Sequence, residues 1–220
     1  MEILLLNNFN SYFIISIYIQ EVKMLTQLKS NYIDSRSASA IFDFSNLVFN
    51  FILKNNKSKN GIIILCIGTD RSTGDSLGPL VGYKLAPYIS NYPNVHLLGT
   101  LEEPVHAKNL DDKINYIKSA YNESLILAID ASLGNMDKIG YISIRNGPIK
   151  PGLGVNKDLP EIGDISITGV VNVGGMMEYL VLQNTRLSLV MNMADVIARS
   201  INIALFRLKS RIIKEGIKYI

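Results

Sequence analysis

Two aspartates, Asp75 and Asp130, follow short apolar runs that are typical of buried strands. Residues 62–67 lead through a polar loop to Asp75, and residues 125–129 end directly at Asp130. In α/β sheets, ligands bind in the crevice beyond the carboxyl ends of the strands, so we expect one pocket to receive both side chains. A carboxylate is costly to bury unless it is used or satisfied, and this pair is therefore the candidate catalytic centre.

Two carboxylates that share a site cannot both ionise cheaply, so the pKa of one rises and the pair retains a proton. Such a pair can activate a water molecule and protonate a leaving group. The same oxygens also suit a divalent metal ion. Each residue has a structural alternative as well: Asp75 as the N-cap of the helix that follows, and Asp130 as a strand-end residue bonded to a neighbouring turn. Their joint position at strand ends favours the functional interpretation.

Two loops rich in glycine and small polar residues accompany the aspartates. The first, residues 68–74, lacks both the Gly-Lys-Ser/Thr ending of a P-loop and the spacing of a dinucleotide site, which argues against nucleotide binding. The second, residues 147–163, is long for a compact domain, and loops of that length often line binding sites. We therefore interpret the second loop as a wall of a substrate site.

The composition narrows the class of protein further. A net charge of +3 over 220 residues is too small to indicate nucleic-acid binding. His106 follows the expected strand at residues 95–98 and could face the same crevice, but two histidines and one cysteine make no zinc-type ligand cluster. The single cysteine, Cys66, is expected in the core, which indicates a reduced, cytoplasmic setting. A Ser/His/Asp triad stays open, although the chain has no G-x-S-x-G elbow.

Apolar periodicity predicts strands that alternate with helices. The link at residues 131–138 is shorter than a parallel crossover needs, so the strand at 139–144 should run antiparallel beside the strand that carries Asp130. We predict a three-layer α/β/α sandwich with a mixed, mostly parallel sheet of about five strands. The expected strands cover residues 62–67, 95–98, 125–129, 139–144 and 166–171.

Residues 1–23 are interpreted as an N-terminal extension, and residues 24–220 as one domain. The extension is apolar, but asparagine and serine interrupt it before it reaches the ~20 apolar residues of a spanning helix. No lysine or arginine precedes Lys23, so the basic region of a signal peptide is missing. We expect no membrane partner, and Met24 offers an alternative start.

Several motifs resemble the sporulation protein YyaC family, over about residues 24–208. They are TDRSTGDSLGPLV at 69–81, IDAS at 129–132, PGLGVNK at 151–157 and ITGVVN at 167–172. More remotely, GDSLGPLV at 74–81 and AIDA at 128–131 are similar to the spore germination protease, an endopeptidase that degrades small acid-soluble spore proteins. Both families resemble hydrogenase maturation proteases, which have a phosphorylase/hydrolase-like three-layer fold and bind nickel through acidic residues at the corresponding strand ends.

The resemblance implies a sporulation-associated peptidase, located in the cytoplasm of the forespore or spore. Asp75 and Asp130 match the motifs of the germination protease's two essential aspartates, so they are expected to be catalytic, with no cofactor and no metal. The glycine-rich loops would hold the peptide and supply N–H donors to the oxyanion. The expected substrate-binding residues are Asp70, Arg71, Ser72, Thr73, Gly74, Ser132, Gly152, Gly154, Asn156, Lys157 and Thr168.

The expected partner is a protein or peptide substrate, with small acid-soluble spore proteins as the candidates that the resemblance suggests, and homo-oligomerisation is left open. One alternative is a maturation-type protease in which Asp75 and Asp130 bind a divalent metal, with His106 as a third ligand. Another is a sporulation protein that binds a peptide in the same crevice without cleaving it. Chelator sensitivity would favour the first alternative, and binding without cleavage would favour the second.

The N-terminal extension should be dispensable for folding, because residues 1–23 lack the caps, turn signals and charge patterning of the domain. A protein that starts at Met24 should keep the thermal midpoint of the full-length protein to within a few degrees. Differential scanning calorimetry of the two proteins side by side checks this expectation. A large drop in the midpoint would show instead that the extension packs into the core.

Overall fold

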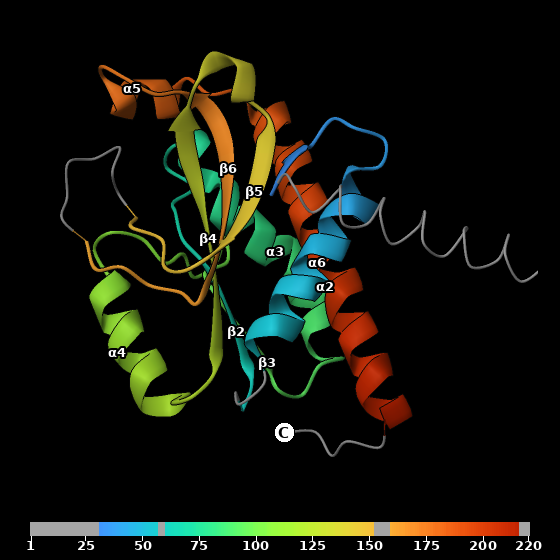
Figure 1. Cartoon of the computed structure of the whole chain (residues 1–220). Helices are drawn as coiled ribbons and strands as arrows, with labels where there is room; N and C mark the ends of the chain where they lie inside the picture. Colours follow the sequence, from blue (N-terminus) through green and yellow to red (C-terminus); the bar gives the residue numbers. More distant parts are fainter. Residues whose placement is uncertain (1–30, 57–59, 152–158, 216–220) are drawn as a thin grey trace, which may run out of the picture. The chain divides into compact units, whose positions relative to one another are not determined.

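The computed structural model describes residues 31–56, 60–151 and 159–215. A six-stranded sheet forms its centre, in the order β1-β5-β6-β4-β2-β3 (Figure 1). The predicted boundary at residue 23 lies outside the described residues. The strands are β1 (Tyr32–Asp34), β2 (Ile62–Cys66), β3 (Val95–Leu98), β4 (Leu125–Gly134), β5 (Tyr141–Asn146) and β6 (Ile165–Val173).

The sheet is mixed and mostly parallel, as predicted. Strands β3, β2, β4 and β6 run parallel to one another, whereas β5 is antiparallel to both β6 and β1. The sheet has one strand more than expected. The additional strand is β1, which is only three residues long. So short a strand shows no apolar periodicity, and it exists because it pairs with β5.

The predicted neighbour of β5 was wrong. The strand does run against the direction of β4, but β6 lies between the two. The reason is that β4 continues past Asp130 to Gly134, after which the short 3₁₀ helix η2 (Met136–Lys138) leads to Gly140. There the N–H of Gly140 donates to the Val170 carbonyl of β6, and Gly140 has a φ of 90°. Strand β5 therefore lies two positions from β4 in the sheet, and β6 occupies the position between them.

Helices cover both faces of the sheet, which confirms the three-layer sandwich. Helix α4 (Leu110–Ala120) covers one face, and α2 (Ala40–Asn55), α3 (Leu77–Ile89) and α6 (Leu187–Glu215) cover the other (Figure 1). The apolar run of β2 serves both layers, because alternate side chains point to opposite faces. Ile62, Ile64 and Cys66 join the larger core under α2, α3 and α6, and Ile63, Leu65 and Ile67 pack with α4. Cys66 is buried, as expected.

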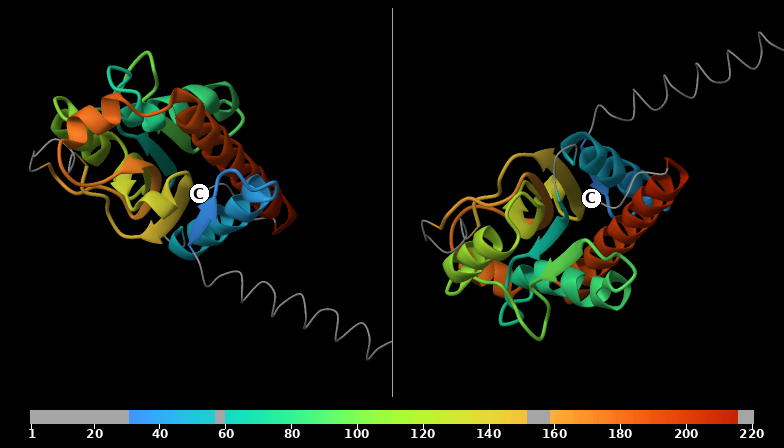
Figure 2. Two further views of the ribbon diagram at one scale, coloured as in Figure 1. Left: turned by 90° about the horizontal axis from the view of Figure 1, so that it is seen from above. Right: turned by 90° about the horizontal axis from the view of Figure 1, so that it is seen from below.

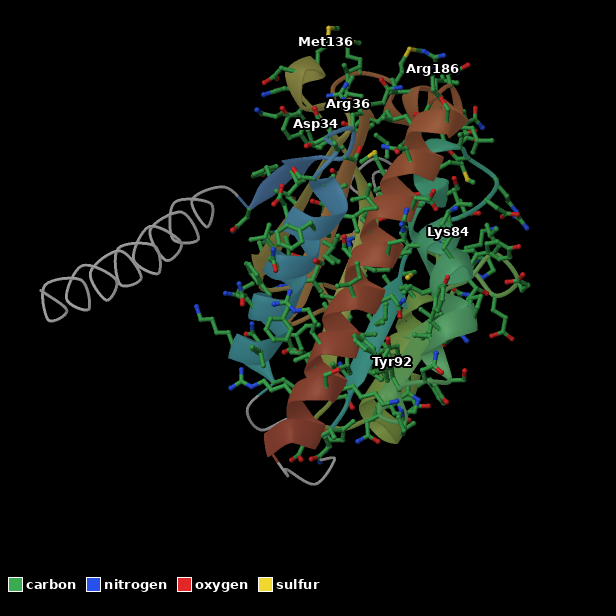
Figure 3. The ribbon with its side chains drawn as sticks, turned by 90° about the vertical axis from the view of Figure 1, so that its right-hand side faces the viewer. Asp34, Arg36, Lys84, Tyr92, Met136 and Arg186 are labelled. Carbon is green, nitrogen blue, oxygen red and sulfur yellow. The ribbon has the colours of Figure 1, made fainter. Side chains whose placement is uncertain are left out.

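The long helix α6 lies between α2 and α3 and contacts both (Figure 3). Its stretch Leu187–Arg211 is long and apolar enough to span a membrane by length and composition, but 56% of the most apolar part is buried inside the fold. The polar contacts of α6 also belong to a packed helix: Asp195 forms an ion pair with Lys84 at 2.7 Å, and Asn202 Oδ1 accepts a hydrogen bond from Tyr92. We therefore interpret its apolar stripe as core.

Helix α3 rests directly on the backbone of the sheet through two glycines. A Cβ atom at Gly78 would overlap the carbonyl group of Ile67, and one at Gly82 would overlap the carbonyl of Gly99. This close approach fixes the start of α3, and with it the segment that carries Asp75.

The substitution Gly78→Ala should lower the free energy of unfolding by about 1–3 kcal/mol, because the new methyl group must displace the backbone of residue 67. This cost exceeds the gain in helix propensity of about 1 kcal/mol that alanine brings. Urea unfolding monitored by circular dichroism provides the measurement. The matched control is Gly174→Ala, where an added Cβ meets only ordinary contacts at 3.6 Å or more. Equal stability of the two variants would contradict the close packing of α3.

Candidate functional site

A cavity of about 360 Å³ lies at the carboxyl ends of β2 and β4, and it receives both aspartates. Figure 2 (left) views the domain from this end, where α5 (Glu178–Gln183) also lies. The wall of the cavity is built by the chain after β2, the segment that carries Asp75, the segment after β3, the second half of β4, the end of β5 with the chain after it, Thr168 of β6, and α5. The lining residues are Ile67, Gly68, Asp75, His106, Ala107, Asp130, Ala131, Ser132, Leu133, Arg145, Ile149, Lys150, Pro151, Leu159, Thr168, Glu178 and Leu182.

Asp130 is held by the sheet itself. It pairs in register with Thr168 of β6, and only 7% of its surface is exposed. The N–H of Ala131 donates to Asp130 Oδ1 at 2.8 Å. Burial raises the pKa of Asp130 well above its usual value, the negative charge of Asp75 raises it further, and the bond from Ala131 lowers it in part. The hydrogen bond from Ala131 does not offset the cost of burying the Asp130 carboxylate. A purely structural role therefore explains Asp130 poorly.

Asp75 lies in the 3₁₀ helix η1 (Gly74–Ser76), which joins the loop after β2 to α3. The N-cap position of α3 is occupied by Ser76, so the sequence-level alternative of Asp75 as the cap of this helix is wrong. The backbone carbonyl of Asp75 accepts a hydrogen bond from the N–H of Thr69, which closes the loop. Burial raises the pKa of the Asp75 carboxyl to about 6, against smaller lowering effects of the Thr69 N–H and of His106.

The two carboxyl groups therefore form an electrostatically coupled pair. Each has a raised pKa, and the charge of Asp75 contributes to the rise at Asp130. Because Asp130 is the more buried of the two, Asp75 ionises first and Asp130 keeps the shared proton. Such a pair presents a base and an acid to the same cavity near neutral pH.

His106 lines the same cavity, as the sequence suggested. Two hydrogen bonds shape its turn: its N–H donates to Asn109 Oδ1 at 2.8 Å, and its Nδ1 accepts from the N–H of Lys108 at 3.3 Å. A neutral ring with an occupied Nδ1 carries its proton on Nε2. His106 can therefore donate a hydrogen bond from Nε2.

The predicted substrate-binding residues divide into three groups. Ser132 and Thr168 line the cavity, and Thr168 also hydrogen-bonds Ser143 at 2.8 Å. The loop residues Asp70, Arg71, Ser72, Thr73 and Gly74 do not line it. Gly152, Gly154, Asn156 and Lys157 lie outside the described residues.

The loop before Asp75 is shaped by local contacts of η1. Ser76 Oγ donates to the Thr73 carbonyl at 2.6 Å, which ties the two ends of that turn together. A Cβ atom at Gly74 would press on Leu182 and Thr185, so this glycine serves the packing of α5 on η1. The role of residues 70–74 in substrate binding stays a prediction.

Sequence reasoning missed the charged part of the cavity wall. Arg145 comes from the end of β5, Lys150 from the following loop, and Glu178 from α5. These three residues carry no shared motif, and only the order of the strands brings them together. The Arg145 guanidinium also donates to the Pro148 carbonyl at 2.9 Å, which places it over that loop.

The chain is similar to known proteins in sequence and in fold. The family described as "Protein of unknown function (DUF1256)" matches residues 32–200. The chain is 56% identical over 142 residues to "Uncharacterized protein YyaC" of Bacillus subtilis (strain 168), a match that covers 64% of this chain and 68% of that protein. The crystal structure of a NiFe hydrogenase maturation protease, HycI from Thermococcus kodakarensis KOD1, superposes with a TM-score of 0.50 and 20% identity. That match covers 73% of this chain and 99% of HycI. At this identity the likeness shows the fold alone.

The raised pKa of Asp75 gives a pH-dependent stability test. The native state holds its proton more tightly than the unfolded chain, so the ionised side chain costs stability once the pH exceeds about 4, and fully so above about 6. Asp75→Asn should therefore raise the free energy of unfolding at pH 8, by up to about 3 kcal/mol, and the gain should vanish near pH 4.

Asp34→Asn is the matched control of opposite sign. Hydrogen bonds from Arg36 lower the pKa of Asp34, so its removal should reduce stability by the same amount from pH 8 down to about pH 4, and this loss should shrink only below pH 4. Thermal unfolding of the three proteins from about pH 2 to pH 8 measures both trends. Loss of stability in Asp75→Asn at pH 8 would contradict the assigned cost of burying this carboxylate.

Proposed function

We propose that this chain, which belongs to the DUF1256 family, is a peptidase that uses Asp75 and Asp130 as a general acid–base pair. One observation carries the proposal: two carboxyl groups from different elements share one cavity, and both have raised pKa values there. Structural acids are usually paired with a base or exposed to water, whereas among the described residues no charge or hydrogen bond offsets the burial of this pair. The protease-like fold supports the same interpretation.

The order of ionisation assigns the two roles. Asp75 acts as the base: it takes a proton from a water molecule, whose oxygen attacks the carbonyl carbon of the peptide bond. Asp130 acts as the acid: it gives its proton to the amide nitrogen as the carbon–nitrogen bond breaks. Transfer of a proton from Asp75 back to Asp130 restores the starting state. The pKa of about 6 at Asp75 keeps this base ionised at neutral pH.

The developing oxyanion needs hydrogen-bond donors inside the cavity. His106 supplies one from Nε2, because Lys108 already occupies Nδ1. This role replaces part of the one that the sequence assigned to the backbone of residues 70–74, which do not line the cavity. We propose a protein or peptide substrate in the cytoplasm of the spore or forespore. Small acid-soluble spore proteins are the first to test.

A metal-dependent variant of this function uses the same residues. Carboxylate oxygens of Asp75 and Asp130 and a ring nitrogen of His106 are of the types that a divalent transition metal accepts, and such an ion would polarise the peptide carbonyl. The part of the chain that the structure describes contains no group of three or more such side chains close enough to hold an ion. We therefore derive no step through a metal. Loss of cleavage in the presence of a chelator, with recovery on adding back a divalent ion, would favour this variant.

Asp130→Asn and Asp75→Asn should each reduce peptide cleavage by about 10²–10⁴-fold, because asparagine keeps the shape but transfers no proton. The measurement is the rate at which wild type and variants cleave purified small acid-soluble spore proteins, read by intact mass. The thermal midpoint of each preparation is recorded as well, to separate lost chemistry from lost fold.

Asp137→Asn is the control for the loss of an acidic side chain, since Asp137 is exposed in η2 and pairs only with Lys138 at 3.4 Å. It should cleave at the wild-type rate. Undiminished cleavage by folded Asp75→Asn or Asp130→Asn would refute the proposed pair. Tight binding by wild type without any cleavage would favour a peptide-binding protein instead.

A further inference from the structure

Strand β4 is longer than its neighbour β2, and one of its edges is left without a strand partner. Pairing with β2 ends at Cys66, which is opposite Ile129. Ile67 then bridges to Val105, on the side away from β4, and the chain turns at Gly68, where φ is 140°. Residues 131–134 pair with β6 on their other side. Within the described ranges, no strand pairs with residues 131–134 where β2 has ended.

Hydrogen bonds at the two ends of this segment show which backbone groups face the open edge. The Ile129 carbonyl accepts from the N–H of Ile67, on the side of β2, and the Gly134 carbonyl accepts from the N–H of Gly174, next to β6. Backbone groups alternate between the two sides of a strand. The register shift between Ser132 and Leu133 skips Val171, so the extra residue belongs to β6 and the alternation along β4 continues. The N–H of Leu133, its carbonyl and the carbonyl of Ala131 therefore point to the open edge.

The cavity reaches this edge. Ala131 and Leu133 pack against the larger core, on the face opposite Asp130 and Ser132, because side chains alternate along the strand. All four residues nevertheless line the cavity. Lining by residues that point to opposite faces is expected where a cavity reaches the edge of a strand.

We propose that an extended segment of the protein substrate binds here as an added strand, through main-chain hydrogen bonds to residues 131–133. This inference rests on the proposed function and names how that site holds its substrate. An exposed strand edge next to a cavity is the arrangement used in β-strand addition, where the main chain gives affinity and pockets for alternate side chains give specificity. An unfolded or extended segment can bind in this way, whereas a helix cannot.

The position of Asp130 fits such a substrate. The N–H of Ala131, which would otherwise face the open edge, is already bonded to Asp130 Oδ1 at 2.8 Å. That bond holds the carboxyl group at the edge, beside the path of the added strand. The main chain of the bound substrate therefore passes Asp130, which protonates the amide nitrogen in the proposed mechanism. Because the hydrogen bonds are to the main chain, recognition depends little on substrate side chains.

Leu133→Pro and Leu133→Ala form the test pair, each made in full-length Asp75→Asn protein so that the probe is not cleaved. Proline removes the N–H that we infer to face the open edge, and proline is tolerated in strands where the N–H faces away from the neighbouring strand. Both variants lose the leucine side chain. The probes are a purified small acid-soluble spore protein and reduced, carboxymethylated casein, which is an unfolded chain. Leu133→Pro should bind at least about tenfold more weakly than Leu133→Ala by calorimetry.

Hydrogen exchange provides a second readout that needs no substitution at residue 133. Either probe should slow exchange of the Leu133 amide in the Asp75→Asn protein, because the added strand takes that hydrogen. This measurement decides the question if Leu133→Pro fails to fold. Equal binding by the two Leu133 variants, no protection at Leu133, or no binding of either probe at 100-fold molar excess would each overturn strand addition.

The two proposals fail in distinguishable ways. Cleavage of a probe by wild type, with no protection of Leu133 and equal binding by both variants, would keep the peptidase and reject strand addition. Protection of Leu133 and weaker binding by Leu133→Pro, with no cleavage by wild type, would keep strand addition and reject the peptidase.

Discussion

The parallel pairing of β2 with β4 is the constraint on which the rest of the structure depends. It sets the carboxyl end of β2, at Cys66, opposite Ile129, the residue directly before Asp130 in β4, and β2 leads to Asp75. Parallel strands need crossovers, and the helices in these connections must cover both faces of the sheet, which leaves the strand ends as the region open to a ligand. The two apolar layers that result are also what keeps the carboxyl groups out of water.

Burial of the two carboxyl groups lowers the folding stability of the whole domain. Their pKa values rise because burial outweighs the charges and hydrogen bonds that lower them, and one buried acid of this kind costs a sizeable fraction of a typical folding free energy. A protein retains such a feature where it serves a function. Asp34 shows the usual arrangement of an aspartate in a folded protein: its side chain is more exposed, and it is hydrogen-bonded to Arg36.

Much of this fold could be predicted from the sequence, and the limits have physical causes. The apolar runs of β2 and β4 predicted both strands and the position of each aspartate, because fully buried strands show an uninterrupted run. The place of β6 between β4 and β5 could not be predicted, since strand order depends on contacts between distant segments. The same holds for the cavity wall at Arg145 and Glu178. The packing role of Gly74 against Leu182 and Thr185 could not be predicted either, since it depends on where α5 lies.

The seating of α3 on two glycines has a mechanical consequence. Most helices rest on a sheet through a layer of side chains that change rotamer on the picosecond-to-nanosecond timescale, and this layer lets the two elements shift against each other. At Gly78 and Gly82 that layer is absent, and backbone meets backbone. The beginning of α3 therefore moves with β2 as one body, and Asp75, which η1 joins directly to this helix, shares the stiffness of the sheet that carries Asp130.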